Sequence, residues 1–192
     1  MMNLSASLLA LLGAYIVGSL PIGFWIAQWY GIQDIRQHGS GNIGATNVAR
    51  FLGLHFFFVV SALDALKAFV YLRLAYEWGF SSFGVMLCAY ALLIGNAHSF
   101  LLHGSGGKGM ATFAGIMLAL NPGLCIALFA TWMIALSYVR VVGIASVITV
   151  CAVPFYALLF TDIYGFLFLL GIVFWIVHRH KDNMRVYYTG RW

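Results

Sequence analysis

The chain has 192 residues, of which 63% are hydrophobic and only 8% are charged, and its mean hydropathy is +0.95. An ordinary soluble domain carries roughly a quarter charged residues, so this composition lacks the polar surface that covers a water-soluble core. The net charge of +5 does not point to nucleic acid, because an excess of lysine and arginine is expected in the inner loops of a membrane protein. We predict an all-α integral membrane protein in which residues 1–192 form one helical domain.

Apolar runs long enough to cross a bilayer, which requires about 20 residues, follow one another along the chain. We expect transmembrane helices at about 4–29, 53–76, 82–102, 109–121, 123–139, 142–160 and 163–179. The fourth is short, and it either tilts or joins the fifth around residues 121–123. With seven spans the termini lie on opposite sides, and most arginines and lysines fall on one side only if the N-terminus is outside and the C-terminus is cytoplasmic.

The first inner loop is rich in glycine and small polar residues and reads HGSGNIGATNVAR from His38 to Arg50. Glycine lets a backbone turn sharply and approach a ligand closely, and successive N–H groups in such a turn bind anions. One interpretation is a phosphate site, and the other is a flexible connector, since glycine-rich loops are common. The candidate phosphate-binding residues are Ser40, Gly41, Asn42, Thr46 and Arg50, with Asn47 as a further donor.

The second inner loop reads GNAHSF from Gly95 and GSGGKGM from Gly104. A Gly-Gly-Lys-Gly run that opens a helix combines backbone donors, the positive end of a helix and a lysine charge. It is not a Walker A loop, because the spacing differs and no Ser or Thr directly follows the lysine. Residue His98 is either a general base or a hydrogen-bonded polar residue between helices. The candidate phosphate-binding residues here are Ser99, Gly106, Gly107 and Lys108.

Two charged residues, Asp64 and Lys67, lie one helical turn apart inside the second span. Charges within a membrane helix are costly and are therefore usually paired or functional. A pair at this spacing lies on one face of a helix and satisfies both charges. A structural pair that supports the site and a direct catalytic role both fit this pattern.

Five segments together resemble, in order and spacing, the signature of the bacterial acyl-phosphate:glycerol-3-phosphate acyltransferases, the PlsY family. They are GSGNIGATNVAR at 39–50, DALK at 64–67, GGKGMAT at 106–112, RVVGIAS at 140–146 and HKDN at 180–183. The resemblance implies an enzyme of phospholipid synthesis that moves an acyl group from acyl phosphate to the 1-hydroxyl of glycerol 3-phosphate. The products are lysophosphatidate and phosphate.

The same resemblance implies a place in the bacterial inner membrane, with the active site on the cytoplasmic side. It implies a separate soluble phosphate acyltransferase that supplies the donor, and no cofactor or metal. It adds Asn183 to the phosphate-binding residues and Arg140, with Asp64 and Lys67, to the residues that support the site. The catalytic candidates are His98, Lys108 and Asn183. For the general base, a substrate phosphate is preferred over His98, because the matched motifs contain no carboxylate or histidine at a certain position.

The chain departs from the family pattern at three places. A Gly-His pair usually precedes GGKG, and here that pair is Gly95-Asn96, with His98 two residues later. The first serine of the family's RYxSLxS segment is replaced by Gly143, and the arginine after the tail asparagine by Val186. These differences indicate a divergent member and leave another acceptor open. The rival classes are a transporter for a phosphate-bearing solute and a membrane scaffold without catalysis.

Overall fold

A computed structural model of the chain describes residues 4–189, which form helices joined by loops with no strand in that range. The chain divides into two compact units, Met1–Leu120 and Asn121–Trp192. The single helical domain expected from the sequence stays a prediction.

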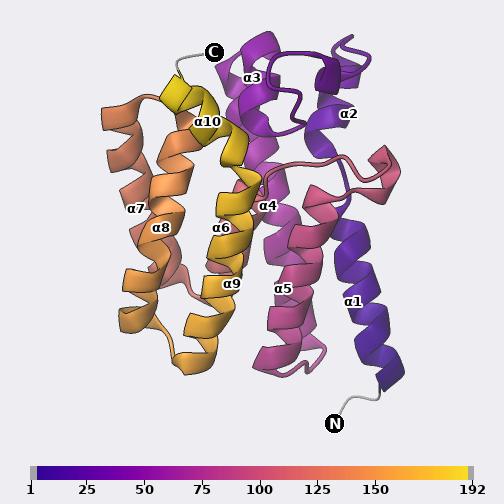
Figure 1. The fold of residues 1–192 in the computed structure, drawn as a ribbon. Coiled ribbons are helices and arrows are strands. Elements are labelled where there is room, and N and C mark those ends of the chain that lie inside the picture. Colours follow the sequence, from indigo (N-terminus) through magenta and orange to yellow (C-terminus); the bar gives the residue numbers. More distant parts are fainter. Residues whose placement is uncertain (1–3, 190–192) are drawn as a thin grey trace. The chain divides into compact units, whose positions relative to one another are not determined.

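The first unit carries both glycine-rich loops. Its elements are α1 (Leu4–Gly18), α2 (Ile22–Trp29), the 3-10 turn η1 (Ile35–Gln37), α3 (Ala45–Leu52), α4 (Leu54–Glu77), α5 (Ser82–Ala97), the 3-10 turn η2 (Phe100–Leu102) and α6 (Met110–Leu120). Within this unit, loops 30–44 and 98–109 lie toward the end opposite the start of α1 (Figure 1). The most extensive packing joins α4 to α6 and α1 to α5.

Small residues bring the long helices of the first unit into backbone contact. A Cβ on Gly18 of α1 would overlap the carbonyl oxygen of Leu92, and one on Gly95 of α5 would overlap that of Tyr15. Gly115 of α6 approaches the backbone of α4 in the same way. In a bilayer, where lipid is as apolar as the helices, such close packing of small residues is a main source of helix association.

The first predicted span, 4–29, is broken into two helices. Pro21 has no N–H to continue the helical hydrogen bonds, and it follows Ser19 and Leu20 in the interruption between α1 and α2. The break leaves carbonyl oxygens without helical partners, which is costly away from water. Side chains from other elements therefore have to satisfy them, and this requirement shapes the site described below.

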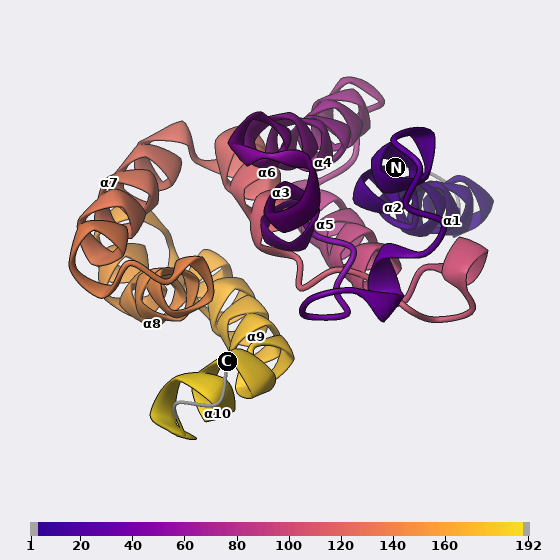
Figure 2. The same ribbon diagram turned by 90° about the horizontal axis from the view of Figure 1, so that it is seen from above.

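The second unit consists of helices that pack side by side (Figure 2). It contains α7 (Pro122–Val139), α8 (Val142–Phe160), α9 (Ile163–Arg179) and α10 (Lys181–Thr189), with α10 packed on α8 and α9. Asn121 caps α7 by accepting the N–H of Leu124 at 3.0 Å, and its amide donates to the carbonyl of Phe160 at 2.9 Å. Asp162 caps α9 in the same way, through the N–H of Gly165 at 2.8 Å.

The lengths and composition of these helices suit a protein that crosses a membrane several times. Within residues 4–189, five segments qualify as spans: Leu4–Trp29, Leu54–Glu77, Ser82–Leu102, Pro122–Val139 and Val142–Phe160. Helix α9 qualifies together with α10, from which it is bent by 49°, and α6 has only 11 residues. The all-helical membrane fold is confirmed, whereas the count of seven spans and the side of each terminus stay predictions.

Candidate active site

The first glycine-rich loop folds around the side chain of Asn47, which is 1% exposed in the first turn of α3. Its Oδ1 accepts the N–H of Ser40 at 3.0 Å, and its Nδ2 donates to the carbonyls of His38 at 2.9 Å and Ile35 at 3.3 Å. Gly39 lies against this amide at a φ of +56°, and a Cβ there would overlap Asn47 Oδ1. The sequence offers Asn47 as a donor to a ligand, but the structure uses its amide to hold the loop.

The remaining polar groups of this loop gather around the start of α3. Asn42 accepts the N–H of Gly44 at 2.8 Å through Oδ1, a bond that engages the oxygen and not the NH₂ group of its amide. The N–H groups in the first turn of a helix have no helical acceptor and attract anions. Thr46 and Arg50 are four residues apart and so lie on one face of α3, and Ser40 and Arg50 are exposed. Phosphate binding by these residues stays a prediction, and this geometry favours it.

The second glycine-rich loop returns along the end of α5 before α6 begins. The N–H of Gly107 donates to the carbonyl of Asn96 at 2.8 Å, and a Cβ on Gly106 would overlap the same carbonyl. Glycine is therefore required here for close contact with α5. The N–H of Gly107 is used inside the protein, so it is not available as a donor to phosphate. Half-buried Lys108 follows directly and precedes the positive end of α6.

Three polar residues at the end of α5 have different surroundings. Ser99 is 1% exposed and donates its hydroxyl proton to the carbonyl of Ser19 at 2.6 Å, so its hydroxyl ties α5 to the break after α1. His98 caps α5 and is exposed, and its carbonyl accepts from the hydroxyl of Tyr15 at 2.9 Å. Asn96 instead lies within the helix and is buried. The position where the family carries histidine is therefore filled by an amide that points into the protein.

The ion pair of α4 is largely shielded from solvent within this unit. Lys67 Nζ lies 2.6 Å from Asp64 Oδ1, with side-chain exposures of 6% and 15%. Lys67 also donates to the carbonyls of Gly18 at 3.1 Å and Leu20 at 3.0 Å and to Asn96 Oδ1 at 3.4 Å. One ammonium thus joins α4, the α1–α2 break and α5, which fits the supporting role expected from the sequence. The partners outside α4 are not visible in the sequence, although Pro21 signals the orphaned carbonyls.

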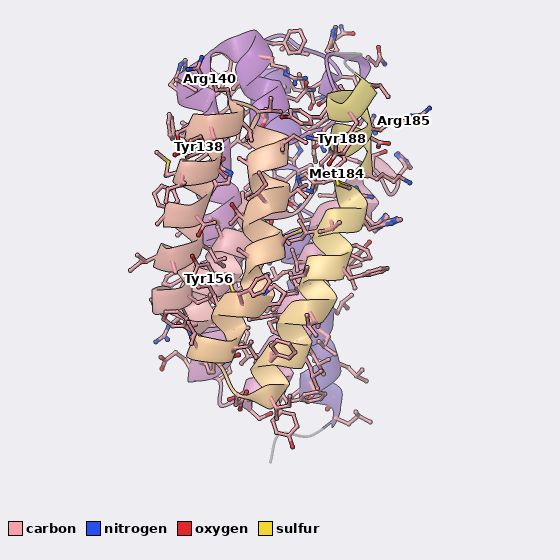
Figure 3. The ribbon with its side chains drawn as sticks, turned by 60° about the vertical axis from the view of Figure 1, so that its left-hand side comes forward. Tyr138, Arg140, Tyr156, Met184, Arg185 and Tyr188 are labelled. Atoms are coloured by element: carbon pink, nitrogen blue, oxygen red, sulfur yellow. The ribbon has the colours of Figure 1, made fainter. Side chains whose placement is uncertain are left out.

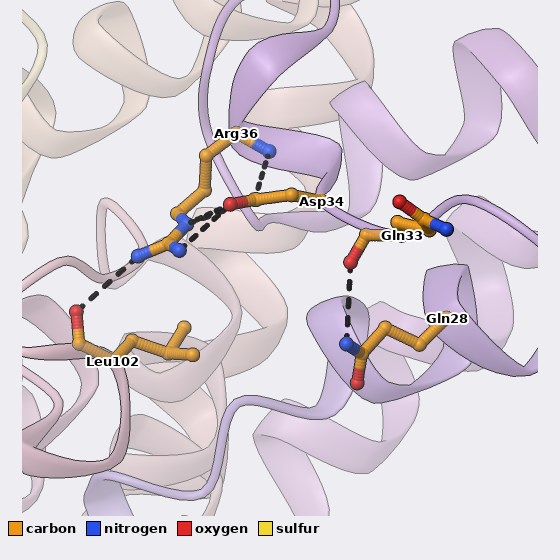
Figure 4. A network of polar contacts seen from close by, with 5 residues as sticks. All are labelled: Gln28, Gln33, Asp34, Arg36 and Leu102. Atoms are coloured by element: carbon orange, nitrogen blue, oxygen red, sulfur yellow. Dashed lines mark hydrogen bonds and ion pairs between the residues drawn. The ribbon is translucent and has the colours of Figure 1, made fainter.

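An apolar cluster and a hydrogen bond connect the two loops. The cluster contains Phe24, Ala27, Ile35, Ile43, Val48, Phe56, Val60 and Leu102. Beside it, Asp34 holds the guanidinium of Arg36 through bonds of 2.7 to 3.2 Å, and Arg36 Nη1 donates to the carbonyl of Leu102 at 3.3 Å (Figure 4). The hydrogen bond and charge of Arg36 hold the pKa of Asp34 below its ordinary value, and Asp34 raises that of Arg36. Sequence reasoning missed this pair, since nothing in a DIR segment reveals the contact with Leu102.

In the second unit, the segments RVVGIAS (140–146) and HKDN (180–183) lie at one end. Arg140 is exposed and ends α7 in the left-handed conformation, with a φ of 53°, and it lies at the same end as Arg185 of α10 (Figure 3). Asn183 of α10 packs on the first turn of α8 so closely that a Cβ on Gly143 would overlap its amide. His180 is buried, and its Nδ1 lies 2.9 Å from the carbonyl of Ile176. Roles for Asn183 and Arg140 in the reaction stay predictions.

Residues 4–189 contain no group of three or more His, Cys, Asp or Glu side chains placed to hold a metal ion. The family model described as glycerol-3-phosphate acyltransferase matches residues 8–190. The chain belongs to the glycerol-3-phosphate acyltransferase family. A relative of that name in Synechococcus sp. (strain JA-2-3B'a(2-13)) is 40% identical over 148 residues, which are 77% of this chain and 74% of the relative. Another, in Chromobacterium violaceum, is 34% identical over 189 residues, 94% and 90% of the two chains.

Solved structures of this family share the fold. The glycerol 3-phosphate form of PlsY (YgiH), an integral membrane glycerol 3-phosphate acyltransferase, has a TM-score of 0.90 at 30% identity and covers 97% of this chain and 94% of that chain. The lysophosphatidic acid form has a TM-score of 0.87 at 29% identity, with 97% and 93% covered. The family resemblance seen in the sequence motifs is therefore confirmed, together with the helical membrane architecture.

Proposed function

We propose that this chain transfers a fatty acyl group from acyl phosphate to the 1-hydroxyl of glycerol 3-phosphate in phospholipid synthesis. The observation that carries the proposal is that two loops with phosphate-binding groups lie toward the same end of the first unit (Figure 1). One offers Ser40, Asn42 and the start of α3, and the other offers Lys108 at the start of α6. Two loops of this kind suit a reaction whose substrates both carry phosphate.

The reaction requires that the two substrates are positioned and that the developing charge is stabilised. The 1-oxygen of glycerol 3-phosphate attacks the acyl carbonyl carbon, a new C–O ester bond forms, and the C–O bond to phosphate breaks. The phosphate leaves with the electron pair, and the hydroxyl proton passes to a substrate phosphate, with exposed His98 as the alternative acceptor. Because the mixed anhydride is already activated, holding the hydroxyl against the carbonyl and stabilising the developing oxyanion supply most of the acceleration.

The charge distribution supports an inner-membrane enzyme that works from the cytoplasmic side. In the first unit, Arg36, Arg50 and Lys108 belong to the polar loops and their helix ends, whereas Arg73 lies near the other end of α4. By the positive-inside rule the polar loops face the cytoplasm and the N-terminus lies outside. Acyl phosphate made by a soluble phosphate acyltransferase then reaches these loops from the cytoplasm, and its acyl chain partitions into the surrounding lipid.

The test is phosphate release by the purified protein in lipid, given palmitoyl phosphate with and without glycerol 3-phosphate. Release that requires glycerol 3-phosphate, with lysophosphatidate formed in equal amount, is the expected result. Release without the acceptor means a hydrolase or another acceptor, and either finding overturns the proposed acceptor. Uptake of glycerol 3-phosphate into sealed vesicles with no phosphate release would identify a transporter instead.

A further inference from the structure

Polar contacts within the first unit help to set the relative position of the two loops. The second loop is fixed to the α1–α2 break through Ser99 and to α5 through Gly107. Its middle, at η2, meets the first loop through the bond from Arg36 Nη1 to the carbonyl of Leu102. Of these three contacts, this last is the one that comes from the loop carrying Ser40 and Asn42.

The guanidinium that makes this bond is held in one orientation. Asp34 accepts from Arg36 Nε at 2.9 Å and Nη2 at 2.7 Å, a two-pronged pairing that restricts an otherwise mobile side chain. The backbone N–H of Arg36 donates to the same carboxylate at 3.0 Å, and the guanidinium lies 5.4 Å from the centre of the Phe24 ring. Four of the five guanidinium N–H groups belong to the terminal nitrogens. Arg36 can therefore pair with Asp34 and donate to the carbonyl of Leu102 at the same time, as Figure 4 shows.

Within the first loop, hydrogen bonds connect the segment that holds Arg36 to the candidate phosphate-binding residues. Ile35, between the paired residues, is buried, and its carbonyl accepts from the Asn47 amide. The same amide accepts the N–H of Ser40. A shift of Arg36 relative to Leu102 is therefore carried to the segment that holds Ser40.

We propose that Asp34 and Arg36 form a positioning clamp that sets the spacing between the two phosphate-binding loops and thereby the affinity for glycerol 3-phosphate. Neither residue is a catalytic residue, because the carboxylate of Asp34 is bonded to Arg36 and the guanidinium to Asp34 and Leu102. The inference rests on the proposed function. The two side chains are 22% and 31% exposed, so their ion pair contributes little to folding, and its removal tests spacing and not stability.

The experiment compares Arg36→Gln, Asp34→Asn and the double variant for KM and kcat with glycerol 3-phosphate. Each single variant is expected to raise KM about tenfold with kcat changed less than about twofold, because displaced loops weaken substrate binding before they affect the bound chemistry. The double variant is expected to match the single ones, since both changes break one clamp. Arg73→Gln, which removes a guanidinium from a looser pair with Glu77 at 3.9 Å, is the matched control and should behave as wild type.

If Arg36 contacted the substrate phosphate directly, the variants would give a different pattern of KM values. In that case Asp34→Asn releases the guanidinium and leaves KM unchanged or lower, and Arg36→Lys restores most of the affinity. The clamp requires that Arg36→Lys recover little, because an ammonium cannot pair with the carboxylate at two points and bridge to Leu102. Wild-type KM in Arg36→Gln, with an active wild-type enzyme, overturns the clamp alone, whereas an inactive wild-type protein overturns the proposed function.

Discussion

Removal of the buried ammonium of Lys67 is the perturbation with the largest expected effect on the fold. Lys67→Met keeps the length of the side chain but leaves Asp64, 15% exposed, without its cation at 2.6 Å. It also removes the donor to the carbonyls of Gly18 and Leu20 in the α1–α2 break. Loss of one partner of a buried ion pair costs about 3–5 kcal/mol, and each orphaned carbonyl adds about 1 kcal/mol.

The assay is the free energy of unfolding in mixed micelles, measured by denaturant titration and compared with thermal unfolding. The neighbouring Leu66→Met, at an exposed position of α4, serves as the control and should stay within about 0.5 kcal/mol of wild type. The double variant Asp64→Leu with Lys67→Met should recover part of the loss, because it leaves no unpaired buried charge. Wild-type stability in Lys67→Met, or a double variant less stable than the single one, would refute the reasoning.

Three further predictions concern the loops and the second unit. Lys108→Ala should lower activity by about 10²–10³-fold, as expected when a charge that stabilises a transition state is lost, with an unchanged unfolding temperature; wild-type activity would remove Lys108 from the site. Gly143→Ala should destabilise the protein by about 1–3 kcal/mol through overpacking against the Asn183 amide, and combination with Asn183→Ala should cancel most of this loss in thermal unfolding. The pKa of Asp34 is lowered by the hydrogen bond and charge of Arg36, so the small stability that this ion pair contributes is present above about pH 4 and is lost as the pH falls through the lowered value; acid unfolding of Asp34→Asn should lack this small component, and identical curves would contradict it.

The sequence by itself determined most of the long helices and the family. Long apolar runs can cross a bilayer only with their backbone hydrogen bonds satisfied locally, so predicted spans at 142–160 and 163–179 coincide with α8 and α9. The short fourth span, expected at 109–121, is α6. The loop motifs identified the family because the order and spacing of glycines and cations are read directly from the chain.

The tertiary structure alone decided which polar groups remain for a ligand. Asn47, Ser99 and the N–H of Gly107 all fit a phosphate site in the sequence, yet each is bonded within the protein. Whether a donor is used internally depends on acceptors that are distant along the chain, such as the carbonyl of Ser19, 80 residues from Ser99. Helix α3 was not predicted because its residues continue a glycine-rich segment whose composition is typical of a loop.

The same physical reason explains the contacts that local patterns missed altogether. The bond between Arg36 and Leu102 and the three contacts of Lys67 outside α4 join residues that the sequence separates by tens of positions. Local patterns fix where a helix begins and which face is apolar, because those properties depend on neighbouring residues. Pairing of a buried charge or an orphaned carbonyl depends on which helices pack together, and only the folded chain determines that.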